Sequence, residues 1–472
     1  MRYEDFLESK KQRAISSGFD KPKDKMNKNL FDWQKDIVFW ALKKGRCALF
    51  EDCGLGKTIQ QLEWAQSVSD HTKMPVLIIS PLAVAEQTKR EGDKFGYKVK
   101  VVRDQNQVDD GINVTNYEIL DHFSASAFGG VVLDESSILK NFTSKTRTEI
   151  IDKFRDTEYK LSCTATPAPN DYMELGNQAE FCGVMSRTEM LATYFIHDGG
   201  DTAKWRLKGH AKDKFWEWLA TWAVVLTNPA DLGYDGRGFE LPKIKTSEII
   251  VNSEADKNAD ELMLLAKIAQ TLGERRDARR NSLYDRCKVA AELVNKNPDD
   301  QWLVWCDLNS ESETLTNLIE GSVEIRGSDS PETKAERLNG FTTGKIEYLV
   351  TKPSIAGWGL NWQNCHKMIF VGLSDSYEMM YQAIRRCWRF GQKNDVDVYI
   401  ITSEAEGAVK ENIDRKEKQA AQMTAEMVKH TKEILEHDIR GTVKISIPYN
   451  PKIEMIVPVW LGGVKNESIK SA

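Results

Sequence analysis

A glycine-containing turn near the start of the chain constrains the fold more than any other feature. Residues 51–58 read Glu-Asp-Cys-Gly-Leu-Gly-Lys-Thr. A short apolar run at 47–50 precedes them, and a helical pattern at 59–65 follows. Strand, glycine turn, Lys-Thr and helix is the order of a phosphate-binding loop. The general pattern has glycine where this chain has Glu51, so one position departs from it.

The residue types in this turn suit a nucleotide phosphate. Gly54 and Gly56 can adopt positive φ and let backbone amides approach a phosphate closely. The start of the following helix adds unpaired N–H groups and the positive end of its dipole. The pattern predicts that Lys57 reaches the β- and γ-phosphates, that Leu55 lies inside the binding loop, and that Thr58 ligates Mg²⁺.

Two adjacent carboxylates follow a second apolar run. Residues 131–133 are Val-Val-Leu, and Asp134 and Glu135 come directly after them. The same chemistry predicts that Asp134 holds Mg²⁺ and that Glu135 orients and polarises an attacking water.

Three later stretches complete an ordered set of motifs. They are Thr-Ala-Thr-Pro at 164–167, Gly-Trp-Gly-Leu-Asn at 357–361, and Gln-Ala-Ile-Arg-Arg-Cys-Trp-Arg-Phe-Gly-Gln at 382–392. In this order the set resembles a superfamily-two helicase, and within that superfamily the Swi/Snf-type ATP-dependent DNA translocases. The resemblance extends from about residue 30 to about residue 403, most of the chain.

The resemblance implies an α/β fold of two RecA-like parallel-sheet lobes, with ATP between them and duplex DNA across the top. Repeated apolar runs separated by helical stretches agree with this fold. The expected domains are an N-terminal arm (1–29), lobe one (30–245), a helical linker (246–284), lobe two (285–403) and a C-terminal helix and hairpin (404–472). A helical insertion at about 170–240 is expected after the Thr-Ala-Thr-Pro motif.

The resemblance also implies roles for residues outside the phosphate loop. Gln34 would read the adenine edge, since an amide donates and accepts at once. Arg386 and Arg389 would act as arginine fingers, because guanidinium stays charged and binds oxyanions well. Gln382 would lie beside them, and Gly359 would contribute to the nucleotide site. The expected nucleic-acid contacts are Thr115, Asn116, Thr164, Thr166, Trp358 and Asn361.

Two cationic stretches have more than one interpretation. Around residues 204–222, cations alternate with tryptophans; Lys204 and Arg206 are predicted DNA contacts, whereas Trp218 and Trp222 fall at helical spacing that favours a core. Six cations between residues 275 and 288, Arg286 among them, suit either nucleic acid or a solvated helix face.

Composition sets the remaining limits. A chain of 472 residues predicts two or three domains, and no run of 18 apolar residues predicts a membrane span. The charged N-terminus and the eight scattered cysteines favour a cytoplasmic protein without a disulfide framework or a zinc site. The resemblance places such a protein in a bacterium or a phage-infected cell. A formal net charge of −6 leaves room for a local basic groove.

The expected function is ATP hydrolysis, with ATP and Mg²⁺, coupled to movement along DNA, with duplex favoured over single strands. The alternatives are a strand-separating helicase on DNA or RNA, a nucleotide-gated binding protein, and the motor subunit of a nuclease or restriction system. A separate nuclease, replication or recombination protein would then be the partner. The sequence leaves the oligomeric state open.

Overall fold

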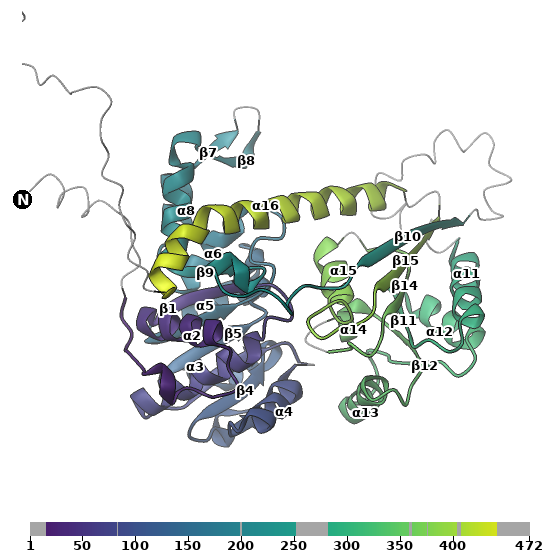
Figure 1. The fold of residues 1–472 in the computed structure, drawn as a ribbon, viewed down its shortest axis with the longest axis horizontal. Coiled ribbons are helices and arrows are strands. Elements are labelled where there is room, and N and C mark those ends of the chain that lie inside the picture. The colour runs from purple at the N-terminus through teal and green to yellow at the C-terminus, as the bar shows by residue number, and fades with distance from the viewer. Residues whose placement is uncertain are drawn as a thin grey trace, which may run out of the picture.

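Two α/β lobes lie side by side, and one long helix crosses from one to the other (Figure 1). The computed structural model describes residues 16–82, 84–198, 201–251, 282–357, 361–374, 376–403 and 407–440. None of the helices in these ranges is long and apolar enough to cross a membrane. The predicted α/β fold of two parallel-sheet lobes is confirmed.

Lobe one is built on a seven-stranded sheet in which every pairing is parallel. The strand order is β3-β4-β2-β5-β6-β1-β9. Strand β2 reads Val-Leu-Ile-Ile-Ser and is buried throughout, as expected for a parallel strand covered on both faces. The strands are β1 (Arg46–Glu51), β2 (Val76–Ser80), β3 (Val99–Val101), β4 (Ile112–Asn116), β5 (Gly130–Asp134), β6 (Tyr159–Cys163) and β9 (Ala223–Leu226).

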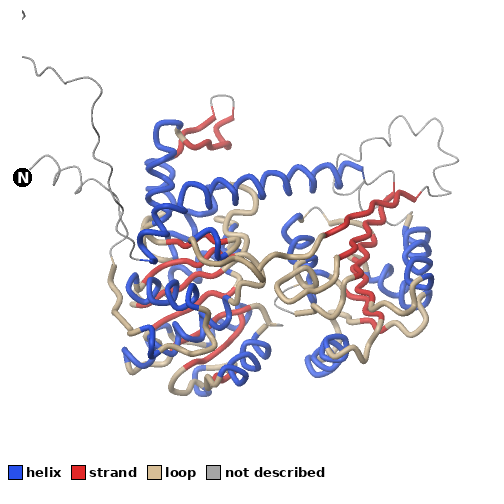
Figure 2. The backbone as a smooth tube through the Cα atoms, viewed as in Figure 1, coloured by secondary structure: helices blue, strands red, loops and turns tan. Residues whose placement is uncertain are grey.

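Helices cover both faces of this sheet (Figure 2). The α-helices of lobe one are α2 (Asp32–Lys44), α3 (Lys57–Thr72), α4 (Ala85–Phe95), α5 (Lys145–Lys153), α6 (Leu175–Phe181), α7 (Arg187–Tyr194) and α8 (Lys212–Ala220). Short 3₁₀ turns are η1 (Lys23–Lys25), η2 (Gln105–Gln107), η3 (Tyr117–His122), η4 (Ala125–Ala127), η5 (Ser136–Lys140), η6 (Tyr172–Glu174), η7 (Gly209–Ala211) and η8 (Pro229–Leu232).

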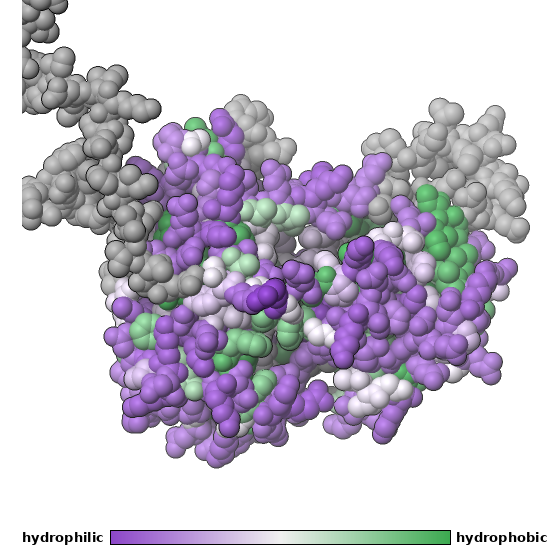
Figure 3. All heavy atoms as spheres, in the orientation of Figure 1, coloured by the Kyte–Doolittle hydropathy of each residue, from purple (hydrophilic) through white to green (hydrophobic). Residues whose placement is uncertain are grey.

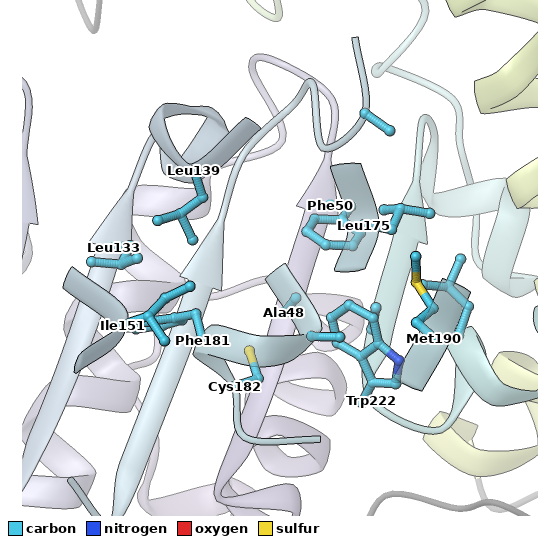
Figure 4. Packing of buried hydrophobic residues seen from close by; sticks show 14 of the residues in the cluster. Ala48, Phe50, Leu133, Leu139, Ile151, Leu175, Phe181, Cys182, Met190 and Trp222 are labelled. Carbon is cyan, nitrogen blue, oxygen red and sulfur yellow. The ribbon is translucent and has the colours of Figure 1, made fainter. Parts of the chain in front are cut away.

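Each face of the sheet has its own hydrophobic core. On one face, α2 and α3 pack against the sheet. On the other, residues of α5, α6 and α8 pack against β1, and Phe50 meets Trp222 edge-on at a ring distance of 5.9 Å (Figure 4). Trp218 and Trp222 are buried, which confirms their interpretation as core residues.

The segment predicted as a helical insertion contains more than helices. It includes an antiparallel hairpin of β7 (Phe195–Asp198) and β8 (Asp201–Leu207), which projects beyond α8 in Figure 1. It also contains β9, which pairs with β1 and completes the main sheet. Helix α7 begins with a capping box between Ser186 and Glu189, a local signal typical of a helix start.

Residues 16–29 lie against lobe one. Lys21 Nζ contacts Glu63 Oε1 at 2.7 Å, and Asn27 N donates to Glu63 Oε2 at 3.0 Å. The sequence predicted an N-terminal arm at 1–29. Residues 1–15 of that arm lie outside the described residues.

Lobe two is built on a six-stranded parallel sheet in the order β10-β15-β14-β11-β13-β12. Its strands are β10 (Ile244–Val251), β11 (Trp302–Cys306), β12 (Val323–Glu324), β13 (Tyr348–Thr351), β14 (Lys367–Val371) and β15 (Val396–Ser403). The predicted helical linker began at residue 246, but β10 is instead an edge strand of this sheet, paired over its full length with β15. Pairing with a strand about 150 residues later cannot be read from local periodicity.

The helices of lobe two are α11 (Leu283–Lys296), α12 (Asn309–Leu318), α13 (Pro331–Thr342), α14 (Pro353–Ala356) and α15 (Tyr377–Ile384). Arg286 on α11 is fully buried and pairs with Glu311 of α12 at 2.9 Å. Neither sequence interpretation of Arg286, nucleic-acid contact or solvated face, was correct. The other predicted linker cations between 275 and 280 lie outside the described residues.

Helix α16 (Gly407–Arg440) follows β15 and spans both lobes (Figures 1 and 2). Val409 and Ile413 belong to a core of lobe two, and Met423 and Met427 belong to a core of lobe one. The hairpin predicted to follow this helix within 404–472 lies outside the described residues. The molecular face in Figure 3 is mainly hydrophilic, in keeping with a chain in which 29% of residues are charged.

Candidate active site

The phosphate loop connects β1 to α3, at the carboxyl edge of the first sheet. Gly54 and Gly56 have φ of +90° and +78°, which side-chain-bearing residues rarely adopt. A Cβ at Gly56 would come within 2.5 Å of Gln34 Nε2, and one at Gly54 within 2.8 Å of Phe390 N in lobe two. Both glycines are therefore required by conformation and by close approach.

The side chain of Lys57 folds back onto its own loop. Its Nζ donates to Glu51 O at 2.7 Å and to Asp52 O at 3.1 Å. Thr58 follows it in the first turn of α3 and is half-buried. Carbonyl oxygens therefore hold the ammonium at the place where the sequence predicted phosphate contact.

Gln34 lies directly against the phosphate loop. Its Oε1 accepts from Phe31 N at 3.0 Å, and its Nε2 donates to Leu55 O at 2.9 Å. The Oε1 end of the amide thus caps the start of α2, and the Nε2 end joins that helix to the loop. Recognition of adenine by Gln34 stays a prediction.

An aromatic cluster beside the loop was not anticipated. Phe390 of lobe two stacks on Phe239 at a ring distance of 4.9 Å. Phe239 also meets Phe31 edge-on at 5.5 Å and Trp33 at 5.7 Å. Phe31 and Phe390 are partly exposed, so the cluster presents aromatic surface next to the phosphate loop.

The two predicted carboxylates end β5 and face the same region. Asp134 Oδ1 accepts from Gln61 Nε2 of α3 at 2.8 Å. Glu135 has a φ of +56°, and its Oε2 is buried with no hydrogen-bond partner among the described residues. Burial raises the pKa of Asp134; burial and the charge of Asp134 raise the pKa of Glu135 to about 7.

These two carboxylates fit a site built for a cation. A buried pair of acids without a full set of donors is costly unless positive charge is supplied. Lys57 and Arg386 are nearby cations, and their charges oppose the rise that burial causes in both pKa values. A carboxylate and a hydroxyl are also the oxygen ligands that Mg²⁺ uses alongside substrate phosphates.

Lobe two brings the predicted arginines to this place. Arg386 is buried; its Nε donates to Gln382 O at 2.8 Å and its Nη2 to Gln382 Oε1 at 3.0 Å. Burial lowers the pKa of Arg386, and burial with the charge of Arg386 lowers the pKa of Arg389 to about 10. Gln382 Nε2 is buried without an acceptor in the described part of the chain. Crowded cations of this kind fit a polyanion such as a triphosphate.

Three further lobe-two residues contact lobe one, and the sequence did not predict them. Arg385 Nη2 donates to Asp52 Oδ2 and to Cys53 O, each at 2.7 Å. Tyr381 Oη donates to Asp52 Oδ1 at 2.7 Å. The adjacency of Arg385 to Arg386 was the one available signal, since its partner lies more than 300 residues away.

The third missed residue is Glu378, in the first turn of α15. It is nearly buried, forms an ion pair with Lys140, and accepts a hydrogen bond from Thr166 Oγ1 at 3.3 Å. Lys140 follows the two carboxylates, and Thr166 belongs to the Thr-Ala-Thr-Pro motif. Helix α15 therefore touches the phosphate loop at one end and these two segments at the other.

The predicted nucleic-acid residues are dispersed. Thr115 and Thr164 are buried, and Thr164 Oγ1 accepts from Thr166 N at 3.1 Å. Asn116 Oδ1 caps η3 through Glu118 N at 3.1 Å. Asn361 has a buried Oδ1 without a partner in the described ranges.

Other predicted residues lie elsewhere or are not described. Arg206 is exposed on β8, in the hairpin that projects away from the lobe sheets (Figure 1). The side chain of Lys204, and residues Trp358 and Gly359, lie outside the described residues. The nucleic-acid contacts predicted for Arg206, Lys204 and Trp358 and for the five residues of the preceding paragraph remain predictions, as does the place of Gly359 in the nucleotide site.

Comparison with known families agrees with the two-lobe organisation. The SNF2-related domain matches residues 33–188, and the helicase conserved C-terminal domain matches residues 285–391. The two matches together include more than half of the chain and contain both halves of the site described above.

Individual relatives are distant. DNA annealing helicase and endonuclease ZRANB3 of Mus musculus is 27% identical over 175 residues, which span 33% of this chain and 16% of the relative. Its Homo sapiens counterpart is 22% identical over 422 residues, 80% of this chain and 38% of the relative. The SWI/SNF-related matrix-associated actin-dependent regulator of chromatin subfamily A-like protein 1 of Xenopus tropicalis is 28% identical over 165 residues, 33% of this chain and 17% of the relative. This chain thus spans well under half the length of these relatives.

Among solved structures, the Sulfolobus solfataricus SWI2/SNF2 ATPase core in complex with dsDNA has a TM-score of 0.41 and 17% identity, covering 88% of this chain and 97% of that one. The two domain matches, in order and around one inter-lobe site, are what assign the chain. It is an SNF2-related member of the superfamily-two helicases, of the Swi/Snf-like type.

Proposed function

We propose that this chain is an ATP hydrolase that couples hydrolysis between its two lobes to movement along duplex DNA. The observation that carries the proposal is that lobe two places Arg386 within electrostatic reach of Cys53 in the phosphate loop and of Glu135, and places Arg389 within reach of Cys53. A site assembled from two lobes links the chemical step to their closure. The family assignment supports DNA as the substrate class.

The roles follow from what each group can do. Lys57 would leave the loop carbonyls and bind the β- and γ-phosphates. Glu135, whose buried Oε2 is available, would orient the attacking water and draw its proton away. Arg386 and Arg389 would stabilise the charge that develops on the γ-phosphate oxygens, a contribution of about 10³–10⁵ in rate for an arginine finger.

Thr58 and Asp134 would hold Mg²⁺. An ion held by these two residues would supply positive charge that offsets the negative charge of the phosphates. Asp134 keeps its orientation through Gln61 Nε2, so the carboxylate is already fixed before any ligand arrives.

DNA would be bound by surfaces on both lobes, so that closure of the lobes moves one DNA-binding surface relative to the other. Thr166 supports this arrangement, because it belongs to a predicted DNA-facing motif and also contacts Glu378 of lobe two. The printed name of one relative, a DNA annealing helicase, gives DNA as its ligand and favours the same ligand class here.

The test is steady-state ATP hydrolysis with duplex DNA, single-stranded DNA, RNA and no nucleic acid. We expect the largest stimulation from duplex. Glu135→Gln is the matched control: it should retain ATP while turnover stops, because its amide cannot take a proton from water. Stimulation by RNA above DNA would reject the proposal.

A second assay separates translocation from strand separation, the alternative considered above. A translocase displaces a third strand bound to an intact duplex, whereas a helicase opens a forked duplex. We expect displacement without fork opening. Cytoplasmic location in a bacterium or phage-infected cell, and a nuclease, replication or recombination partner, remain predictions from the resemblance; fractionation and co-purification from the native source test them.

A further inference from the structure

Asp52, inside the phosphate loop, is bound by lobe two through both of its carboxylate oxygens. Oδ2 accepts from Arg385 Nη2, and Oδ1 accepts from Tyr381 Oη, each at 2.7 Å. Oδ1 also accepts from Cys53 N within the loop at 2.6 Å. The carboxylate therefore joins the loop backbone directly to helix α15.

Burial and a second hydrogen bond hold the Arg385 side chain in this contact. It is almost fully buried, and its Nη2 also donates to Cys53 O at 2.7 Å. Burial alone would lower the pKa of the guanidinium, but Tyr381 and Asp52 raise it above its ordinary value. A buried cation with a carboxylate and a carbonyl as partners is strongly destabilised when either partner is removed.

The contact lies one residue from a predicted finger. Arg386 bonds back to Gln382 on α15 through two nitrogens, so the place of α15 fixes the place of Arg386. Phe390, on the same segment, approaches Gly54 so closely that a Cβ there would be 2.8 Å from its backbone nitrogen. Docking of α15 on the loop thus sets the distance between the fingers and the phosphate site.

We propose that Arg385, with Tyr381, is a positioning residue that docks lobe two on the phosphate loop through Asp52 and thereby places Arg386 and Arg389. The proposal rests on the function proposed above and adds a residue to it. Arg385 itself touches the loop carboxylate and a loop carbonyl, and acts on hydrolysis through its neighbours.

The first measurement is lobe closure, which does not depend on hydrolysis. All eight native cysteines are buried, so cysteines introduced at the exposed positions Asp93 of lobe one and Lys345 of lobe two can carry a pair of distance labels. We expect Asp52→Ala and Arg385→Ala each to lengthen the label distance in the nucleotide-free protein. The double variant should be no more open than either single variant, because both remove the same contact.

The second measurement is nucleotide affinity against turnover. Both single variants should bind ATP within about threefold of the parent and lose at least about tenfold in DNA-stimulated kcat, the size typical of coupling between two sites. Tyr381→Phe removes only one hydrogen bond and should show a smaller loss, which keeps the proposal testable if a buried-arginine variant fails to fold. Arg337→Ala is the matched control, since it removes an ion pair with Asp329 inside lobe two and should change neither readout.

The outcomes separate this proposal from the proposed function. Unchanged label distance and parental kcat in well-folded Asp52→Ala and Arg385→Ala proteins would overturn the docking role. Losses that multiply in the double variant would also overturn it, because the residues would then act independently. If the parent does not hydrolyse ATP, the proposed function fails, while the distance measurement still decides whether the contact docks the lobes.

Discussion

At the residue scale, Glu51 is the position where the phosphate loop departs from its usual pattern. The side chain is fully buried; its Oε2 accepts from Gln60 Nε2 at 2.8 Å, and its Oε1 has no partner among the described residues. Burial raises its pKa to about 7, although Lys57 and the Gln60 amide oppose the shift. Burial of this carboxyl therefore costs more free energy of folding when the group is ionised than when it is protonated.

Replacing Glu51 by Gln should stabilise the nucleotide-free protein at pH 8 but not at pH 4. A carboxyl whose pKa is higher in the folded state favours folding while it is protonated, and that advantage is lost as pH rises from the unfolded value, about 4.5, through 7. The gain at pH 8 is at most about 3 kcal/mol of unfolding free energy. Denaturant unfolding of both proteins at pH 4, 6 and 8 measures it, and an equal difference at all three values would contradict the buried, titrating acid.

Lys57, Asp134 and Glu135 were predicted from residue type and spacing alone, and the structure brings them to one place. Their roles stay predictions that the hydrolysis assays test. Asp52, Tyr381 and Arg385 were not predicted, because a polar residue in a loop gives no indication of a partner in another lobe. The role of a residue could be predicted where a local sequence motif indicates it. It could not be predicted where the role depends on a contact with a distant segment.

At the scale of elements, α16 is the feature whose importance the sequence understated. The sequence predicted a C-terminal helix within 404–472 without indicating what it packs against. The buried residues Met423, Met427, Thr431, Leu435 and Ile439 recur every four positions, which is the spacing of one helix face. That face packs on lobe one, although the helix emerges from lobe two.

Loss of this face should release the helix from lobe one. Met427→Ala removes a buried side chain and should cost about 2–4 kcal/mol of unfolding free energy. Amide hydrogen exchange should rise along residues 419–439 and stay unchanged in α11. Gln422→Ala, at an exposed position of the same helix, is the control. Protection of residues 419–439 equal to that of the parent would show that the packing of Met427 does not hold α16.

At the scale of the whole molecule, the chain carries a net charge of −6 yet is proposed to bind DNA. A negatively charged protein can still bind DNA, because binding depends on a few local cations that contact phosphates and not on the total charge. Helix α15 and helix α16 both connect the lobes, so DNA bound to either lobe is mechanically linked to the nucleotide site.

DNA affinity should therefore fall steeply with salt and vary little with sequence. About six phosphate contacts would reduce the association constant by roughly 10³ between 50 and 200 mM salt, through release of condensed counterions. Fluorescence anisotropy on two unrelated duplexes of equal length, over a salt titration, measures both effects. A large preference for one duplex at fixed salt would indicate base readout instead.

The sequence by itself determined the local chemistry and most of the elements. Repeated apolar runs predicted strands of a parallel sheet, and β2, β5, β11, β13 and β14 are such runs; the phosphate loop was predicted because its glycines and Lys-Thr pair carry their own geometry. The tertiary structure decided everything that joins distant segments: β10 on the second sheet, Arg286 paired in a core, α16 laid across to lobe one, and Arg385 on Asp52. Periodicity and spacing report what a segment is, whereas pairing across hundreds of residues depends on how whole elements pack, and no local pattern encodes that.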